Sequence, residues 1–168
     1  IWMLGSTPAG ARIAAELGVG FSFAGHFSMA EADAALATYR KLFRPSATMP
    51  EPRVMMAAGV ICAATQARAE ELARCVKLAV ARLSRGEKRR FPTVEEAAHA
   101  SFGPVDEMAA ARFSEGAVVG DEPRVKAGLA ALVERTGADE LMIATMVPDP
   151  AERIASYEGV ARAWGLVS

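Results

Sequence analysis

A short turn near the start of the chain carries residue types that bind anions. Gly5 and Gly10 would let the backbone approach a ligand closely. Ser6 and Thr7 add two hydroxyl groups, and Thr7 followed by Pro8 is typical of a helix start. The first turn of a helix presents free N–H groups and the positive end of the helix dipole. The segment therefore predicts a phosphate cradle; the alternative is a helix start that binds no ligand.

One histidine stands where a catalytic side chain could lie. His26 follows the apolar, glycine-bounded segment 18–25, which is a strand candidate. In parallel α/β folds, ligands collect at the carboxyl ends of the strands. An imidazole there could polarise a ligand or donate a proton. The alternative is a histidine that only hydrogen-bonds a neighbouring backbone group.

The cysteines and histidines do not suggest a disulfide framework or a metal centre. Cys62 lies in an apolar strand-like run and Cys75 in a helical pattern, so we expect two buried thiols. A reducing cytoplasm fits this usage. His26 and His99 are far apart in the sequence, with no cysteine or carboxylate at ligand spacing, so we expect no metal site.

The composition narrows the class of protein. A length of 168 residues suits a single domain, and 52% hydrophobic with 23% charged residues indicates a globular chain. A net charge of −1 and few aromatic residues indicate neither a basic surface for nucleic-acid phosphates nor a stacking surface for bases. No apolar run reaches the roughly 18–20 residues that span a bilayer. We therefore expect neither nucleic-acid nor membrane binding.

Four apolar segments are predicted to be strands, and helical patterns separate them. The strand candidates are residues 1–4, 18–25, 53–64 and 138–147. Alternation of this kind predicts right-handed crossovers and a parallel sheet, either open or part of a closed barrel. Residues 86–118 mix a basic run, two prolines and two short helical patterns. We interpret them as an irregular excursion and a candidate mobile loop within one domain of residues 1–168.

Local signals place the helix ends. Thr7 and Gly18 bracket the first helix, Ser28 and Glu31 form a capping-box pattern before the second, and Asp121 with Gly137 bracket a later one. The last helix is predicted to begin at Asp149 and Pro150. A long helix from about Gln66 is predicted to bury one face; its members are Leu72, Val76, Ala79 and Leu83.

Three segments resemble the luciferase-like flavin-dependent monooxygenase family, and together they cover most of the chain outside the excursion. They read WMLGSTPAGARIAAELGVGFSFAGHF, RVMMAAGVICAATQARAEELA and VVGDEPRVKAGLAALVERTGADELMIATMVPDPAERIASYE. The third is the most specific, with its Gly-Asp-x-Pro-x-Val opening and its Thr-Gly-Ala-Asp-Glu-Leu-Met core.

The resemblance implies a fold. Members of this family are (β/α)8 barrels of roughly twice this length. The resemblance places IWML at the fifth strand and ELMIATM at the eighth, so the chain would be the C-terminal half of a barrel, cut just before or within strand five. The excursion corresponds to the position of a mobile active-site loop in related enzymes.

The resemblance also implies a cofactor and a reaction. Reduced FMN binds at the barrel mouth, and with oxygen it oxidises an organic substrate, often an aldehyde or another carbonyl compound. The flavin phosphate sits against the turn after strand five, which corresponds to Gly5, Ser6, Thr7 and Gly10. Related sequences often read Gly-Ser-Ser-Gly-Tyr-Ser there, whereas Pro8 removes one N–H donor here. Sister families use a deazaflavin instead, and a flavin reductase is an expected partner.

The resemblance predicts that this chain alone is incomplete. The catalytic histidine and much of the flavin pocket of the family come from the first four strands, so we expect a fragment without activity by itself. The alternative is a non-catalytic module that binds flavin or phosphate. A half barrel exposes two sheet edges and an apolar inner face, which favours a homo-oligomer or association with the missing half.

Overall fold

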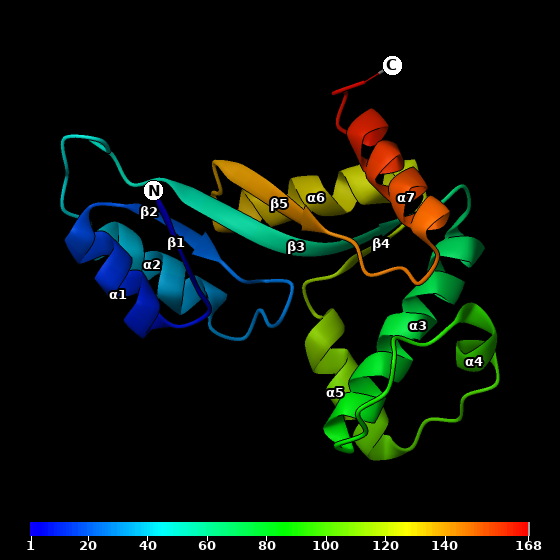
Figure 1. The fold of residues 1–168 in the computed structure, drawn as a ribbon. Helices are drawn as coiled ribbons and strands as arrows, with labels where there is room; N and C mark the ends of the chain where they lie inside the picture. The colour runs from blue at the N-terminus through cyan, green and yellow to red at the C-terminus, as the bar shows by residue number, and fades with distance from the viewer. Residues whose placement is uncertain (168) are drawn as a thin grey trace.

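A parallel five-stranded sheet organises the structure, a computed structural model that describes residues 1–167 apart from the side chain of residue 113 (Figure 1). The strands are β1 (Trp2–Gly5), β2 (Gly20–Phe23), β3 (Val54–Cys62), β4 (Val118–Gly120) and β5 (Glu140–Ala144). β1 pairs with β2, and β2 pairs with the start of β3. β5 pairs with the middle of β3, and β4 pairs with its last residues. The four expected strands are therefore present, and the three-residue β4 was not expected.

Residues 1–167 also form seven helices: α1 (Pro8–Leu17), α2 (Ala32–Leu42), α3 (Gln66–Ser84), α4 (Val94–Ala98), α5 (Pro104–Ser114), α6 (Glu122–Thr136) and α7 (Pro150–Ala163). The predicted alternation of strands and helices is confirmed, and so is the α/β class with a parallel sheet.

The strongest helix-end signals in the sequence form the predicted caps. The Thr7, Asp121 and Asp149 side chains each accept a hydrogen bond from a backbone N–H in the first turn of the following helix. Gly18 and Gly137 end their helices with φ of 63° and 58°, in the left-handed region that glycine tolerates.

The predicted capping box at Ser28 and Glu31 is wrong. α2 begins at Ala32, Glu31 makes no side-chain cap, and the Ser28 Oγ accepts from the Ala30 N–H at 3.3 Å. A serine can satisfy the backbone of a turn as well as that of a helix, so the pattern fits both. A complete capping box lies instead at Thr93 and Glu96, before α4.

One face of the sheet carries the main hydrophobic core. Its buried members come from alternate positions of β2 and β3 and from the helices α1, α2 and α6: Phe21, Phe23, Val54, Met56, Ala58, Val60, Ala14, Leu36, Tyr39 and Leu129. Alternation sends the neighbouring residues to the opposite face. There Leu4 and Met142 are 59% and 49% exposed, so that face carries uncovered apolar surface.

The long helix α3 does not pack flat on the sheet. Figure 1 shows α3, α4 and α5 as a group beyond the carboxyl end of β3, while α6 lies along β3 and β5. α6 therefore provides the crossover helix, with Val125 and Leu129 in the main core. The predicted inner stripe of α3 was partly wrong: Leu72 is buried but Leu83 is 75% exposed, and the buried face continues instead through Cys75 and Leu78.

Two polar side chains fix neighbouring strands and helices. The Asp139 N–H donates to the Val54 carbonyl at 2.9 Å, and the Asp139 Oδ2 accepts from the Val54 N–H at 2.8 Å. The Tyr39 hydroxyl donates to the Val19 carbonyl at 2.9 Å and accepts from the Arg53 N–H at 3.2 Å. Burial raises the pKa of Tyr39, so the hydroxyl stays protonated and able to donate.

We predict that Tyr39→Phe lowers the free energy of unfolding by about 1–3 kcal/mol, because it leaves the Val19 carbonyl and the Arg53 N–H without their partner. Chemical denaturation measures this. Tyr157→Phe is the matched control, since that side chain is 43% exposed and its hydroxyl accepts one bond from the Thr145 N–H. An equal or larger loss in the control would contradict the role assigned to Tyr39.

Candidate functional site

The turn between β1 and α1 has the geometry of a small concave backbone surface. Ser6 and Thr7 are exposed, and the Thr7 Oγ1 accepts from the Gly10 N–H at 3.3 Å. A Cβ on Gly5 would lie 3.2 Å from the Phe21 ring and 3.7 Å from the Gly10 Cα. Gly5 therefore lets the strand end come close to both the core and the start of α1.

The donors of this turn suit an anion. Thr7 and Ala9 occupy positions whose N–H groups have no intrahelical acceptor, whereas Pro8 has no N–H to offer. The two exposed hydroxyls add donors, and the first turn of α1 contains no acidic residue. The residues present therefore fit a phosphate group, with fewer donors than a turn without proline would give.

The loop that carries His26 follows β2, the neighbour of β1 in the sheet. The Ala24 N–H at the end of β2 donates to the Gly5 carbonyl at 2.9 Å, which ties the two strand ends together. The His26 Nδ1 is buried and has no hydrogen-bond partner, and its ring centroid lies 4.1 Å from that of Phe27. Burial lowers the pKa of His26, so the imidazole is neutral near neutral pH.

A contact between two loops that the sequence did not predict joins the α3–α5 group to the strand ends. A Cβ on Gly25 would approach the Ala57 carbonyl and the Met29 Sδ to 2.7 Å. A Cβ on Gly116, which lies between α5 and β4, would come within 3.2 Å of the Gly25 carbonyl. Both positions need glycine because backbone is packed against them. The loop that carries His26 is therefore held against the segment that leads into β4.

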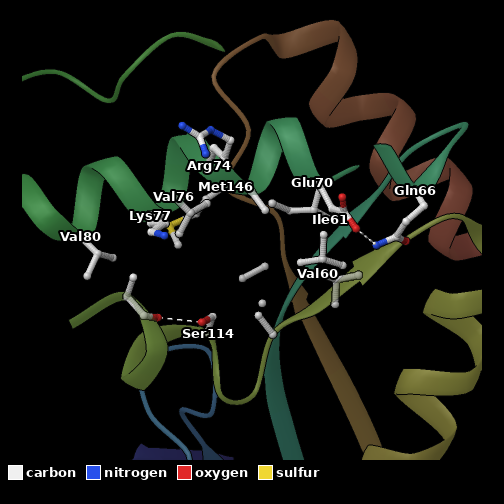
Figure 2. Close-up of a pocket in the computed structure, with 16 residues that line it drawn as sticks. Val60, Ile61, Gln66, Glu70, Arg74, Val76, Lys77, Val80, Ser114 and Met146 are labelled. Atoms are coloured by element: carbon white, nitrogen blue, oxygen red, sulfur yellow. Dashed lines mark hydrogen bonds between the residues drawn. The ribbon is translucent and has the colours of Figure 1, made fainter. Parts of the chain in front are cut away.

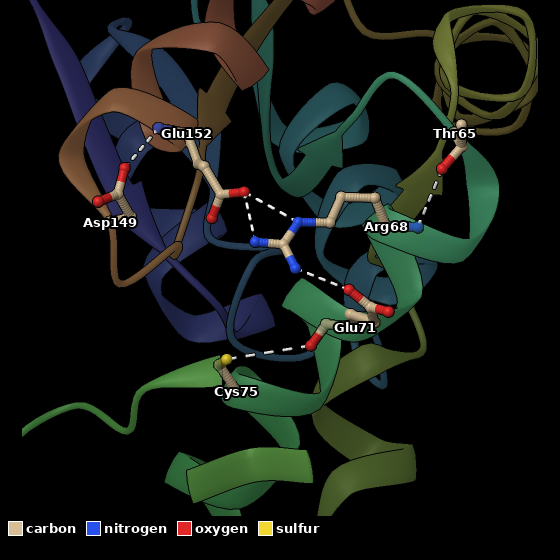
Figure 3. A network of polar contacts seen from close by, with 6 residues as sticks. All are labelled: Thr65, Arg68, Glu71, Cys75, Asp149 and Glu152. Atoms are coloured by element: carbon tan, nitrogen blue, oxygen red, sulfur yellow. Dashed lines mark hydrogen bonds and ion pairs between the residues drawn. The ribbon is translucent and has the colours of Figure 1, made fainter. Parts of the chain in front are cut away.

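An ion-pair network fixes α3 to α7 at the same edge of the sheet (Figure 3). The Arg68 guanidinium donates to Glu152 from Nε at 2.9 Å and to Glu71 from Nη1 at 2.7 Å. These two carboxylates raise the pKa of Arg68, with the hydrogen bond to Glu71 the larger cause. The caps Thr65 and Asp149 hold the first turns of the two helices. The Glu152 N–H donates to the Asp149 cap at 2.9 Å, while the Glu152 carboxylate accepts from Arg68.

A cavity of about 330 Å³ opens between α3, α5 and the last residues of β3 (Figure 2). Most of its lining is aliphatic, including Ile61, Val76 and Val80. The cavity could not be predicted from the sequence, because its walls come from three strands and two helices that only the folded chain brings together. The carboxyl ends of parallel strands meet at one edge, so the cavity lies at the same edge as the turn after β1.

The two cysteines are buried and unpaired, as predicted, and burial raises the pKa of both thiols. Within residues 1–167, no three His, Cys, Asp or Glu side chains gather in a way that could hold a metal ion. In the same residues, no helix combines the length and apolar character needed to cross a membrane.

Comparisons with known proteins relate this chain to a family. The family model for luciferase-like monooxygenases matches residues 1–140. The Bacillus subtilis protein YvbT is 35% identical over 164 residues, which are 98% of this chain and 49% of YvbT. A luciferase-like monooxygenase of Escherichia coli K12 is 32% identical over 158 residues, covering 94% of this chain and 47% of that protein. The chain thus spans about half the length of these relatives.

Solved structures share the fold. The crystal structure of apo-MsnO8 matches with a TM-score of 0.90 and 32% identity, over 99% of this chain and 51% of MsnO8. At 17% and 16% identity, which supports the fold alone, the oxygenating constituent of an FMN-bound diketocamphane monooxygenase and a coenzyme F420-dependent reductase match with TM-scores of 0.56 and 0.57. The expected half of a (β/α)8 barrel is confirmed by these matches.

We predict that His26 titrates below the usual histidine pKa of about 6.5, because burial disfavours the imidazolium. The unfolded chain then binds more protons than the folded one near this pH, so stability falls as the pH drops below about 6.5. NMR titration of the ring protons measures the pKa directly, since the chain has only two histidines.

His26→Gln should remove this part of the pH dependence of stability, whereas the same change at the exposed His99 serves as the control. A His26 pKa at or above about 6.5 would show that the ring is not buried as described.

Proposed function

The chain belongs to the luciferase-like monooxygenase family, and we propose that the complete protein uses reduced FMN and oxygen to oxidise a small organic substrate. The observation that carries the proposal is the turn after β1, where Gly5, Ser6, Thr7 and Gly10 form a cradle that fits a phosphate. When bound, the reduced flavin supplies the electrons that activate oxygen. Because the chain spans about half the length of its relatives, the activity is proposed for the whole protein.

The residues of the turn hold the phosphate end of the cofactor in this proposal. The N–H groups of Thr7 and Ala9 and the two hydroxyls donate to phosphate oxygens, and the α1 dipole adds a favourable field. Gly10 keeps the first turn of α1 clear of a side chain. A phosphate-bearing deazaflavin would meet the same donors, so parallel titrations with FMN and F420 decide between the two cofactors.

We assign His26 to the reaction as a neutral hydrogen-bonding group next to the cofactor. Its lowered pKa and its unpartnered buried Nδ1 leave it free to hold a proton or to accept one from a ligand. We further propose that a separate reductase supplies the reduced flavin and that the protein works in the cytoplasm, where its unpaired buried cysteines stay reduced.

For the 168-residue chain alone we propose binding of flavin without turnover. The oxygen-consumption rate with FMN and dithionite should then stay at the level of free flavin, while FMN still binds. Faster oxygen consumption would mean that these residues suffice for the reaction.

We also propose that a second copy of the chain covers the exposed face of the sheet. Leu4 and Met142 are 59% and 49% exposed there, and burial of such side chains favours association. Because this face is apolar along the strands, it can be covered by a second copy of the chain. The remaining part of a barrel could cover the same face.

The phosphate cradle predicts that the chain binds FMN more tightly than riboflavin, which lacks the phosphate. Ser6→Asp should reduce FMN affinity by about tenfold or more through charge repulsion, while riboflavin binding stays unchanged. A carboxylate at a helix N-terminus does not harm folding. Calorimetry measures both ligands, and Ser6→Ala is the control that changes no charge. Equal FMN binding by wild type and Ser6→Asp would refute the cradle.

Because a second copy is proposed to cover the exposed apolar face of the sheet, the purified chain should elute as a dimer or larger assembly in size-exclusion chromatography. Met142→Glu should shift it toward the monomer, because the new charge lies on the apolar face. Ile13→Glu on α1 is a matched control, since Ile13 is 48% and Met142 49% exposed. A soluble wild-type monomer, or an equal shift in both variants, would rule out this interface.

A further inference from the structure

The loop after α3 encloses a second hollow, which shares no lining residue with the aliphatic cavity described above. Its volume of about 560 Å³ lies within the range of small-molecule sites. One part of the wall is apolar and comprises Ala79, Leu83 and Phe91, and the other part is charged: Arg82, Glu87, Lys88, Arg89 and Arg90. The basic run in this loop takes no part in the function proposed above.

Cations outnumber carboxylates around this hollow. Of its described lining residues, four are cationic and one, Glu87, is a carboxylate. The Glu87 Oε1 already accepts from the Arg85 Nε at 2.8 Å, and the Glu87 Oε2 lies 3.3 Å from the Arg89 Nε. Arg85 also pairs with Asp106, so this neighbouring pair adds no net charge. The positive charge that remains favours an anionic ligand.

Arg82 gives the most specific sign of an anion site. Its side chain is only 12% exposed, and its Nη1 lies 3.6 Å from the Glu96 Oε2, which is too long for a hydrogen bond. That carboxylate oxygen instead accepts from the Thr93 N–H at 3.0 Å, in the cap of α4. Within residues 1–167 the Arg82 guanidinium donates no hydrogen bond. Because burying a charged donor without an acceptor is costly, a bound anion would stabilise this arrangement.

The end of α3 does not itself require these cations. Basic side chains often lie at a helix C-terminus, where they offset the helix dipole and bind the last carbonyls. Here the N–H groups of the following turn bind those carbonyls: Arg85 donates to Ala81, Gly86 to Leu83 and Glu87 to Arg82. Gly86 has a φ of 75°, which lets the chain turn back at this point. The charged side chains are therefore left to face the hollow.

From these contacts we propose that the hollow binds a nucleoside phosphate. The Arg82 and Arg90 guanidinium groups and the Lys88 ammonium donate to the phosphate oxygens, which suit the planar fork of arginine. Leu83 and Phe91 are 75% and 36% exposed, so they offer an apolar and an aromatic surface to the nucleoside. A concave wall of this kind fits a compact molecule better than a flat bilayer. The proposal does not depend on the flavin turn, because it involves different residues.

Three probes test this inference: ADP, adenosine and pyrophosphate, titrated by calorimetry into the full chain at low salt and without flavin. We expect ADP to bind about tenfold or more tightly than either of the others, since adenosine carries no phosphate and pyrophosphate has no apolar part. Equal or tighter binding of adenosine or pyrophosphate, or no binding of ADP at millimolar concentration, would overturn the inference.

Charge-removing variants locate the site. Arg82→Gln should weaken ADP binding by about tenfold, because it removes charge-assisted hydrogen bonds. Arg90→Gln should also weaken it, and since this side chain is 81% exposed, the variant keeps the test valid if Arg82→Gln does not fold. Arg112→Gln removes the same charge from the exposed side of α5 and should leave ADP binding unchanged. Equal losses in Arg90→Gln and Arg112→Gln would show that no specific site exists here.

Phosphate groups could also come from lipids, and vesicles that contain phosphatidylglycerol test that source. We expect the chain to stay in the supernatant when these vesicles are sedimented. Sedimentation with the vesicles, together with no binding of ADP, would assign the basic loop to a membrane surface instead and overturn the proposal.

This proposal and the flavin proposal fail separately. Ser6→Asp should leave ADP affinity unchanged, whereas Arg90→Gln should leave FMN affinity unchanged. A loss of ADP binding in Ser6→Asp, with normal binding in Arg90→Gln, would place the nucleotide at the flavin turn and remove the present inference. A chain that binds ADP but not FMN would keep the hollow as a nucleotide site and refute the cradle.

Discussion

The pairing of β3 with its neighbours is the constraint on which the rest of the structure depends. Asp139 holds the register of β5 on β3 through two hydrogen bonds to Val54, one from its backbone and one to its side chain. At the other end of the strand, the Thr145 hydroxyl donates to the Val60 carbonyl at 2.9 Å. A shift by one residue would move the buried side chains of β3 to the opposite face, so the core itself opposes slippage.

This register brings all the candidate groups to one edge. The turn after β1 and the His26 loop follow two neighbouring strands. The starts of α3 and α7 lie further along this edge, where β3 continues from Met56 to Cys62 beyond its pairing with β2, and the bond from Arg68 to Glu152 joins them. The glycine contacts at Gly25 and Gly116 then fix the α3–α5 group against the same edge. The aliphatic cavity exists because this group is held there.

Local chemistry was predictable from the sequence where one short segment decides the outcome. Thr7, Asp121 and Asp149 cap helices, and Gly18 and Gly137 end them, because each interaction involves residues only a few positions apart. Ser28 shows the limit, since the same side chain can satisfy a turn. The buried face of α3 differs from the prediction because Leu72 packs against Ile61 of β3, whereas Cys75 and Leu78 pack against α4.

Long-range features could not be predicted in this way. The cavity, the Arg68 network and the unpartnered Nδ1 of His26 depend on segments that are distant in the chain. The family resemblance predicted the half barrel, which is confirmed, and a phosphate-binding role for the turn after β1, which stays a prediction. The structure adds which atoms of that turn are free to donate. The pairing of Lys77 with Glu107 beside the cavity could be recognised only from side-chain contacts.

The central claim is that the turn after β1 holds a flavin phosphate, and amide NMR during an FMN titration tests it most directly, because it locates even weak binding. The account predicts saturable shifts of the Ser6, Thr7, Ala9 and Gly10 amides with FMN, and much smaller shifts of these four signals with riboflavin. Unchanged signals for these amides while FMN shifts residues elsewhere would contradict the account.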